Sequence, residues 1–247
     1  MATTRGEPWS RGELVAAIKL YCITPFGRIH SRNPSLIALA QSLGRTPSAI
    51  ALKLTNFASL DPTIARAGMA NYSKLDKIVW DDFFANMDAY LSENEKPQNL
   101  TGMNEQAAEF ILPIRDGVDV RRLTKTRVNQ DFFRSLVMAS YDNKCALTGI
   151  DAPELLVASH IVPWSVDPAS RTNPRNGICL NALHDRAFDE GLITIAEDLA
   201  VQYSPHLPPS TKAELVAFGQ PKLRLPARFI PDRQFLDYHR TKVFMAT

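Results

Sequence analysis

The sequence predicts an α+β protein, in which a helical N-terminal module is followed by a C-terminal module of two short strands and a helix. Apolar residues recur at helical spacing through most of the first 91 positions, whereas residues 155–162 form an apolar, β-branched run. Between these regions, residues 92–104 are polar, contain proline and glycine, and show no periodicity. We therefore expect two domains, at 1–95 and 105–247, joined by a linker.

The composition excludes a disordered, fibrous or membrane-spanning protein. Of the 247 residues, 45% are apolar and 22% are charged, which is typical of a globular chain with a packed core. No run approaches the ~18 apolar residues of a membrane span. The cysteines Cys22, Cys145 and Cys179 are far apart and form no C-x-x-C pair, which argues against a disulfide framework or a four-cysteine zinc site. These features predict a cytoplasmic protein.

Local capping signals define the first two N-terminal helices. Ser10 and Glu13 form a capping box, and the apolar residues that follow share one helical face over residues 10–22. Asn33-Pro34 supplies an N-cap and a first-turn proline for a second helix, and Gly44 marks its end.

A third helix is predicted to begin at Thr46-Pro47, where the same cap and proline recur. Two helices joined by a short turn that contains glycine predict a helix-turn-helix-like module. The residues on the outer face of the third helix and in the turn before it are Arg45, Ser48 and Asn56, and we expect them to contact DNA. Leu52 on the same face favours the alternative, a helical bundle whose third helix is simply covered.

Charges are unevenly distributed, although the formal net charge is only +2. Residues 28–66 carry five Lys or Arg side chains and one acid, so phosphates are expected to bind there. Residues 76–95 carry six acids and one lysine. The run 72–91 predicts one amphipathic helix whose inner face packs under the first three helices. Its inner face comprises Ile78, Trp80, Phe83, Phe84, Met87 and Leu91.

The C-terminal half predicts a helix, then strand, loop, strand and helix. Residues 127–149 begin as an amphipathic helix, from which Arg127 and Arg134 project as candidate phosphate contacts or as ordinary solvated side chains. Residues 155–162 predict a buried strand, residues 178–180 a second strand, and residues 181–188 a helix. This reading places His160 near the end of the first strand and His184 in the first turns of the helix.

Three polar residues in this region carry a specific resemblance. The segments that contain them are Ser159-His160-Ile161-Val162-Pro163, Asn176-Gly177-Ile178-Cys179-Leu180 and His184-Asp185-Arg186-Ala187-Phe188-Asp189. Their His-Asn-His order resembles that of HNH (ββα-metal) endonucleases, and most closely the restriction-endonuclease branch whose helix reads H-x-x-x-F-D-x-G. The resemblance spans about residues 120–245 and implies hydrolysis of double-stranded DNA with Mg²⁺ or Mn²⁺.

The resemblance also implies roles for individual residues. His160 is the expected general base, because a neutral imidazole can take a proton from water at neutral pH. Asn176 is expected to brace the loop or to orient the His160 ring. His184 is the expected metal ligand, and Asn181 or Asp189 is a possible second one; few protein ligands are required, since Mg²⁺ retains several waters. The loop residues Arg171 and Arg175 are further candidate DNA contacts.

Two departures from the commoner family pattern matter. Ser159 stands where many members have an Asp or His metal ligand, so the full ligand set is left open. Thr148 stands where a second cysteine would pair with Cys145, so no structural zinc is expected.

The resemblance suggests that the biological role is restriction of foreign or base-modified DNA. A homing or toxin nuclease is the alternative among enzymes, and a DNA-binding regulator with a degenerate HNH domain is the alternative outside them. One HNH site handles one strand at a time, so cleavage of both strands would imply a homodimer.

Overall fold

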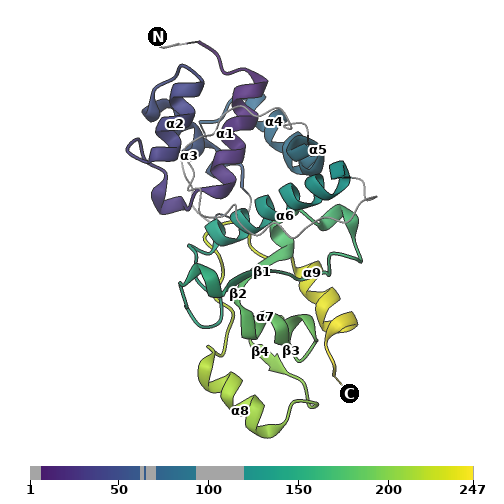
Figure 1. The fold of residues 1–247 in the computed structure, drawn as a ribbon. Helices are drawn as coiled ribbons and strands as arrows, with labels where there is room; N and C mark the ends of the chain where they lie inside the picture. The colour runs from purple at the N-terminus through teal and green to yellow at the C-terminus, as the bar shows by residue number, and fades with distance from the viewer. Residues whose placement is uncertain (1–6, 62–63, 65–70, 93–119, 247) are drawn as a thin grey trace. The chain divides into compact units, whose positions relative to one another are not determined.

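The computed structural model describes residues 7–61, 64, 71–92 and 120–246 (Figure 1). The chain divides into two compact units. The helical unit comprises Met1–Tyr21, Gly27–Leu60 and Gly68–Phe132, and the C-terminal unit comprises Cys22–Phe26, Asp61–Ala67 and Phe133–Thr247. Residues 93–104 of the predicted linker lie outside the described residues. None of the described helices is both long enough and apolar enough to cross a membrane.

The first three helices begin where the capping signals predict. They are α1 (Arg11–Ile23), α2 (Pro34–Ser42) and α3 (Pro47–Ala58). The side chain of Asn33 accepts a hydrogen bond from Ser35 N, and that of Thr46 accepts one from Ala49 N. Each cap therefore satisfies an amide that the first turn of a helix leaves unpaired. A four-residue connection, 43–46, separates α2 from α3.

The predicted single helix over 72–91 is two helices, α4 (Lys74–Ala85) and α5 (Met87–Ser92). Ile78, expected in the core, is 48% exposed, whereas its neighbour Val79 is fully buried. Asp76 explains the rotation of α4: it closes a capping box with Ser73 and accepts two hydrogen bonds of 2.9 Å from the Lys53 ammonium group. A buried carboxylate must face its cation, so α4 turns Asp76 inward and Ile78 outward.

The C-terminal unit is built around a two-stranded antiparallel sheet. Its elements are α6 (Val120–Ser140, of which Phe133 onward belongs to this unit), β1 (Leu156–His160), β2 (Gly177–Asn181), α7 (Ala182–Asp189), β3 (Ile193–Ile195), β4 (Val201–Tyr203), α8 (Pro209–Phe218) and α9 (Arg233–Tyr238). The register pairs Leu156 with Asn181 and His160 with Gly177. β3 pairs with β4 in a second, smaller sheet. The predicted strand, strand and helix are thus present; α8 was not predicted.

The β1–β2 sheet lies between the end of α6 and α7 (Figure 1). A Cβ added to Gly177 would lie 2.4 Å from Val137 Cγ2 and 2.9 Å from Phe133 Cζ, so only glycine allows α6 to approach this closely. Buried apolar side chains from all three layers form one core, which includes Phe133, Val137, Leu156, Ile178, Leu180 and Phe188.

The end of α7 is fixed by Gly191. Its φ of +67° lies in the left-handed region, and an added Cβ would come within 2.1 Å of the Val243 carbonyl oxygen. The π-helical turn η6 (His239–Val243) therefore packs directly on this glycine. His239 in this turn is buried; its Nε2 donates to Phe188 O at 3.0 Å and its Nδ1 accepts from Thr194 Oγ1 at 2.9 Å.

Candidate functional site

His160 ends β1 and is held on three sides. Its Nε2 lies 2.9 Å from the carbonyl oxygen of Arg171. Its ring stacks on Phe133, with centroids 3.9 Å apart and planes 12° apart, and meets the edge of the Trp164 ring at 5.3 Å. A carbonyl only accepts hydrogen bonds, so the ring proton must be on Nε2 and the lone pair on Nδ1.

The surroundings of His160 favour its neutral form. Burial lowers the pKa of the imidazole, and the bond to the Arg171 carbonyl only partly opposes this effect. The side chain is thus unprotonated at neutral pH. A neutral imidazole with a free Nδ1 lone pair can accept a proton from water.

Asn176 braces the loop between β1 and β2. Its side chain is buried; Oδ1 accepts from Val162 N at 2.8 Å, and Nδ2 donates to Val162 O and Ser170 O, each at 3.2 Å. These bonds connect the residues just after β1 to the segment that carries Arg171. Of the two roles expected for Asn176, the contacts match loop bracing: it reaches His160 only through the backbone.

Arg171 holds this loop and is not a free cation. Its Nε donates to Trp164 O at 2.8 Å, and its guanidinium lies 5.1 Å from the Trp164 ring centroid. The same residue therefore presents its carbonyl to His160 and anchors the aromatic edge that His160 meets.

His184 and Asn181 lie in a buried polar cluster away from His160. The His184 side chain is fully buried, its Nδ1 is 3.1 Å from Asn181 Nδ2, and its ring stacks on Phe218 of α8. Asn181 is the N-cap of α7, and its Nδ2 also lies 3.2 Å from Thr148 Oγ1 and 3.6 Å from Cys145 Sγ. Asn181 Oδ1 and Nδ2 are both engaged within this cluster, whereas His184 Nε2 is buried without a hydrogen-bond partner among the described residues.

All three cysteines are free thiols, and Cys145 lies in this cluster. Cys145 and Thr148 face Asn181, and the sulfur of Cys179 lies 3.5 Å from Met138 Sδ. Among the described parts of the chain, no three His, Cys, Asp or Glu side chains are placed to hold one metal ion.

Asp185 and Asp189 emerge from another face of α7. They are four residues apart, so they lie one turn apart on the same side of the helix. Burial raises the pKa of the half-buried Asp185, and a hydrogen bond from the Ser159 hydroxyl partly opposes this effect. Desolvation and the nearby charge of Asp185 raise the pKa of Asp189 to about 6. Asp189 was expected as a possible ligand, whereas Asp185 was not named from the sequence.

The arginines predicted to contact DNA are mostly engaged within the protein. Arg134 donates to Leu156 O at 2.8 Å and Pro153 O at 3.1 Å. Arg175 forms an ion pair with Asp232 at 3.0 Å and donates to Ile230 O. The side chain of Arg127 lies outside the described residues. Arg186, which was not predicted, has a side chain that is 75% exposed.

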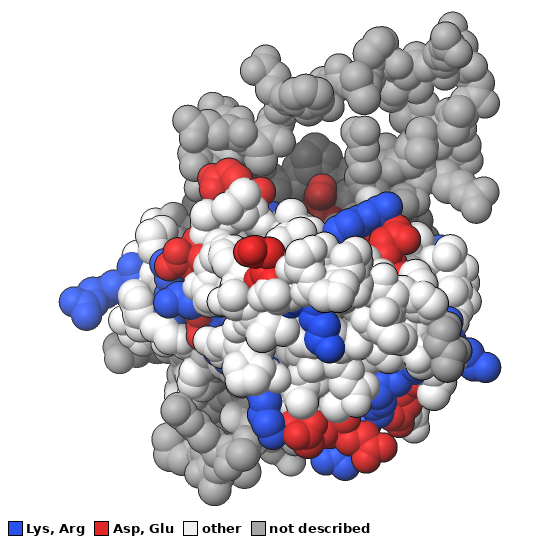
Figure 2. Space-filling model, turned by 90° about the horizontal axis from the view of Figure 1, so that it is seen from below, with Lys and Arg blue, Asp and Glu red and all other residues white. Residues whose placement is uncertain are grey.

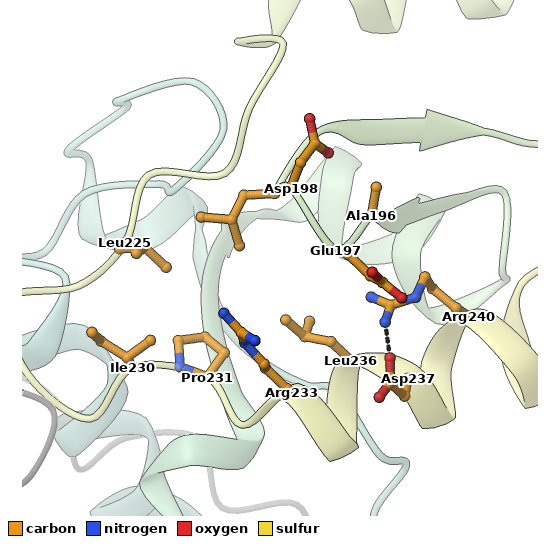
Figure 3. A pocket seen from close by; sticks show the side chains of 11 residues that line it. Ala196, Glu197, Asp198, Leu225, Ile230, Pro231, Arg233, Leu236, Asp237 and Arg240 are labelled. Atoms are coloured by element: carbon orange, nitrogen blue, oxygen red, sulfur yellow. Dashed lines mark ion pairs between the residues drawn. The ribbon is translucent and has the colours of Figure 1, made fainter.

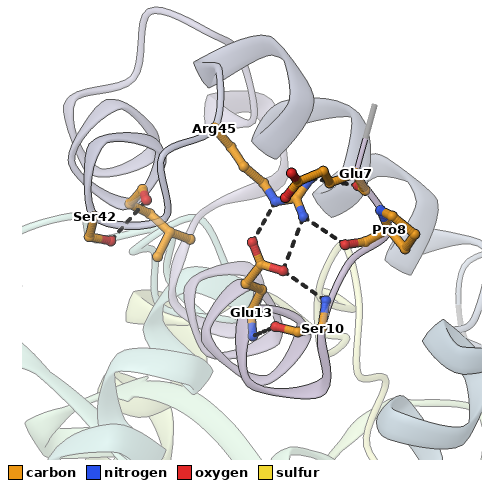
Figure 4. Close-up of polar contacts among 7 residues, drawn as sticks. Glu7, Pro8, Ser10, Glu13, Ser42 and Arg45 are labelled. Carbon is orange, nitrogen blue, oxygen red and sulfur yellow. Dashed lines mark hydrogen bonds and ion pairs between the residues drawn. The ribbon is translucent and has the colours of Figure 1, made fainter. Parts of the chain in front are cut away.

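Arg45 is an internal residue of the helical unit, contrary to the predicted DNA contact (Figure 4). Its guanidinium makes a fork to both Glu13 oxygens, at 2.6 and 3.0 Å, and donates to the carbonyls of Glu7 and Pro8. It also stacks on Trp9 at 4.3 Å, and only 6% of the side chain is exposed. The ion pair lowers the pKa of Glu13 to about 2.

The outer face of α3 remains accessible. Ser48 is exposed, Asn56 is partly buried, and Leu52 between them is 57% exposed. In the basic segment 28–66, Arg45 and Lys53 are both paired inside the unit. Of the described Lys and Arg residues in this segment, Arg28 and Arg32 are exposed. Seen from below, the molecule shows Lys and Arg interspersed with Asp and Glu (Figure 2).

A pocket of about 690 Å³ lies beside α9, apart from His160 (Figure 3). Leu225, Ile230 and Leu236 give it an apolar lining, and Asp237 and Arg240 form an ion pair at its rim. Neither His160 nor the α7 aspartates line this pocket, so it is not part of the candidate catalytic site.

Comparison with known families agrees with the geometry. The family described as HNH endonuclease matches residues 145–196, the segment that carries β1, β2 and α7. None of the curated proteins compared with the chain matches it. The matched segment contains His160, Asn176 and His184 in the order expected from the sequence. Residues 145–196 of this chain are therefore similar to the HNH endonuclease family.

Proposed function

We propose that this protein is a divalent-metal-dependent endonuclease that hydrolyses double-stranded DNA, with His160 as the general base. The observation that carries the proposal is the bond from His160 Nε2 to the Arg171 carbonyl, because it leaves Nδ1 as the proton acceptor. The HNH family match supports DNA as the substrate.

In the proposed reaction, Nδ1 of His160 takes a proton from water as the water oxygen attacks phosphorus and the bond from phosphorus to the 3′-oxygen breaks. Phe133 and Trp164 hold the ring in place, and Asn176 fixes the loop that carries the Arg171 carbonyl. A bound Mg²⁺ or Mn²⁺ would neutralise charge on the phosphate oxygens. The carboxylate of Asp185 on α7, beside Ser159, is an oxygen donor of the kind that fits such a hard cation.

Restriction of foreign or modified DNA is the proposed biological role, and it rests on the resemblance of the H-x-x-x-F-D-x-G helix. The proposed role of the helical unit is to locate DNA in a helix-turn-helix-like manner, through the exposed α3 face at Ser48 and the exposed Arg28 and Arg32. A homodimer is proposed for cleavage of both strands.

Cleavage of supercoiled plasmid tests the proposal. Methylated and unmethylated plasmids are incubated with the purified chain in EDTA, Mg²⁺ or Mn²⁺, and the ends are mapped. Cleavage that requires the added metal supports the enzyme, and preference for one plasmid supports restriction. A folded chain that binds plasmid but leaves it intact with either metal would instead support a DNA-binding regulator with a degenerate HNH domain. Elemental analysis of the same protein is expected to find no stoichiometric zinc.

A further inference from the structure

We infer that Arg171 is a catalytic residue of the proposed nuclease, and that its guanidinium group binds the phosphate whose bond is broken. The inference rests on the proposed nuclease function and specifies how the site holds its substrate. Among the DNA contacts expected from the sequence, it singles out one that meets the reacting group. A guanidinium can donate two parallel hydrogen bonds to two phosphate oxygens, which an ammonium group cannot do.

The guanidinium of Arg171 is held at Nε and open at its other two nitrogens. Nε donates to Trp164 O at 2.8 Å, and the group lies 5.1 Å from the Trp164 ring centroid. Neither Nη1 nor Nη2 has a hydrogen-bond partner among the described residues, and the side chain is only partly buried. The two terminal nitrogens therefore present a pre-oriented fork to a ligand.

The positive charge of Arg171 is not balanced by the residues around it. Arg134 donates from both terminal nitrogens to backbone carbonyls, and Arg175 is paired with Asp232. Asp167, the acid of the β1–β2 loop, accepts from a backbone amide at 2.9 Å. No carboxylate of the described residues forms an ion pair with Arg171, so an anion beside it is electrostatically favoured.

The same loop connects this fork to the proposed base. The backbone carbonyl of Arg171 lies 2.9 Å from His160 Nε2, and the Trp164 ring contacts both the His160 ring and the Arg171 guanidinium. One residue would thus fix the tautomer of the base through its carbonyl and the position of the phosphate through its side chain.

The fork would act mainly in the transition state. As water attacks phosphorus and the bond to the 3′-oxygen breaks, negative charge grows on the phosphate oxygens that the guanidinium holds. A donor that is already oriented toward those oxygens stabilises the transition state more than the bound substrate, and this difference raises the rate.

DNA binding by the full chain in EDTA tests the contact without reference to cleavage. Affinity for a fluorescently labelled duplex is measured by anisotropy at several salt concentrations for the parent, Arg171→Gln and Arg171→Lys. Arg233→Gln is the matched control, since Arg233 is an exposed arginine of the same unit that lines the α9 pocket, apart from His160 (Figure 3). Plasmid cleavage with Mg²⁺ or Mn²⁺ and thermal melting are measured on the same proteins.

We expect Arg171→Gln to bind DNA more weakly, with a slope of log affinity against log salt that is shallower by about 0.9, because one phosphate contact is lost. Its cleavage rate at saturating DNA should fall about 10²- to 10³-fold, the usual cost of losing one pre-oriented donor to transition-state charge. Arg171→Lys should keep the parent slope, because its charge remains, but recover little of the rate, because the fork is lost. Arg233→Gln should match the parent in both measurements.

A purely structural role of Arg171 predicts a different result. The ¹⁵N chemical shifts of the His160 ring report which nitrogen carries the proton, and we expect Arg171→Gln to retain the proton on Nε2, because the backbone carbonyl is still present. Slow cleavage with a changed tautomer and a parent-like salt dependence would make Arg171 a positioning residue and overturn the inference.

The inference also fails if folded Arg171→Gln cleaves like the parent, or if Arg233→Gln shows the same losses. Its failure is distinguishable from failure of the nuclease. Metal-dependent cleavage by the parent and equally fast cleavage by Arg171→Gln would reject the role of Arg171 and retain the function. If the parent does not cleave, a salt dependence that is shallower in Arg171→Gln alone would retain a phosphate contact and reject the nuclease, whereas an unchanged salt dependence would reject both.

Discussion

The Nε2 atom of His160 lies 2.9 Å from the carbonyl oxygen of Arg171, a residue eleven positions later in the chain. This contact determines which imidazole nitrogen carries the proton, and the β1–β2 loop that supplies the carbonyl is in turn held by Asn176 and Trp164. The proposed chemistry of one side chain therefore depends on the conformation of the whole loop.

Replacement of His160 tests the proposed base. We expect His160→Ala to lower the cleavage rate by about 10²- to 10⁴-fold, the usual contribution of a positioned general base. DNA affinity should change little, because binding depends on other groups. Cleavage rate, DNA affinity and circular dichroism are measured beside His206→Ala, which alters an exposed histidine. Parent-like cleavage by folded His160→Ala would refute this mechanism.

Replacement of Asn176 tests the bracing of the loop. Asn176→Ala leaves the buried Val162 amide and the Ser170 carbonyl without their side-chain partner, so we expect a loss of about 1–3 kcal/mol in the free energy of unfolding. The rate should also fall, since the Arg171 carbonyl is no longer held. Urea unfolding and cleavage are compared with Asn173→Ala, whose side chain makes a single bond to Arg175 N. Equal effects of the two variants would contradict the bracing role.

His239 predicts a pH dependence of stability. Burial lowers its pKa from 6.5 to about 4, so the unfolded chain binds a proton more readily between these values. Stability is then complete above about pH 6.5 and decreases as the pH falls toward 4, by an amount on the order of 3 kcal/mol. Urea unfolding of the parent and His239→Gln from pH 4 to 7.5 checks this expectation. The variant should be less stable at neutral pH and show a shallower dependence; parallel curves would contradict it.

Arg45 is expected to matter for stability. Arg45→Ala leaves Glu13 and the Glu7 and Pro8 carbonyls without their donor, and we expect it to lower the melting temperature. Arg45→Lys should restore little, because an ammonium group cannot reproduce the bidentate fork. Arg32→Ala, on the surface, is the control for a lost charge. If Arg45→Ala melted like the parent and selectively weakened DNA binding, the result would support Arg45 as a DNA contact instead.

The local structure of this protein was largely predictable from its sequence. Asn33, Thr46 and Asn181 begin helices through bonds to amides two or three residues away, and such contacts depend only on neighbouring residues. The apolar β-branched run before Pro163 similarly predicted β1. The His160 to His184 pattern was sufficient to indicate the HNH family, because its residues and their order are local features of the sequence.

Tertiary structure decided which charged and polar residues are available. Arg45 and Lys53 were counted as a basic surface, but their partners Glu13 and Asp76 lie 32 and 23 residues away and take them out of solvent. Formal charge along a sequence does not reveal such pairing, since it arises only when helices pack and desolvate the two groups together.

The same limit applies to the polar residues at the start of α7. His184 and Asp185 are consecutive, and an α-helix rotates about 100° per residue, so they point to different sides of α7. The sequence motif contains both His184 and Asp185, but it does not determine which side of α7 packs against β1. The packing of α8, unpredicted from the sequence, buries His184 against Phe218, and Asp185 is then the residue beside Ser159. Helix orientation is determined by burial of apolar surface across the whole unit, and this information exists only in the folded chain.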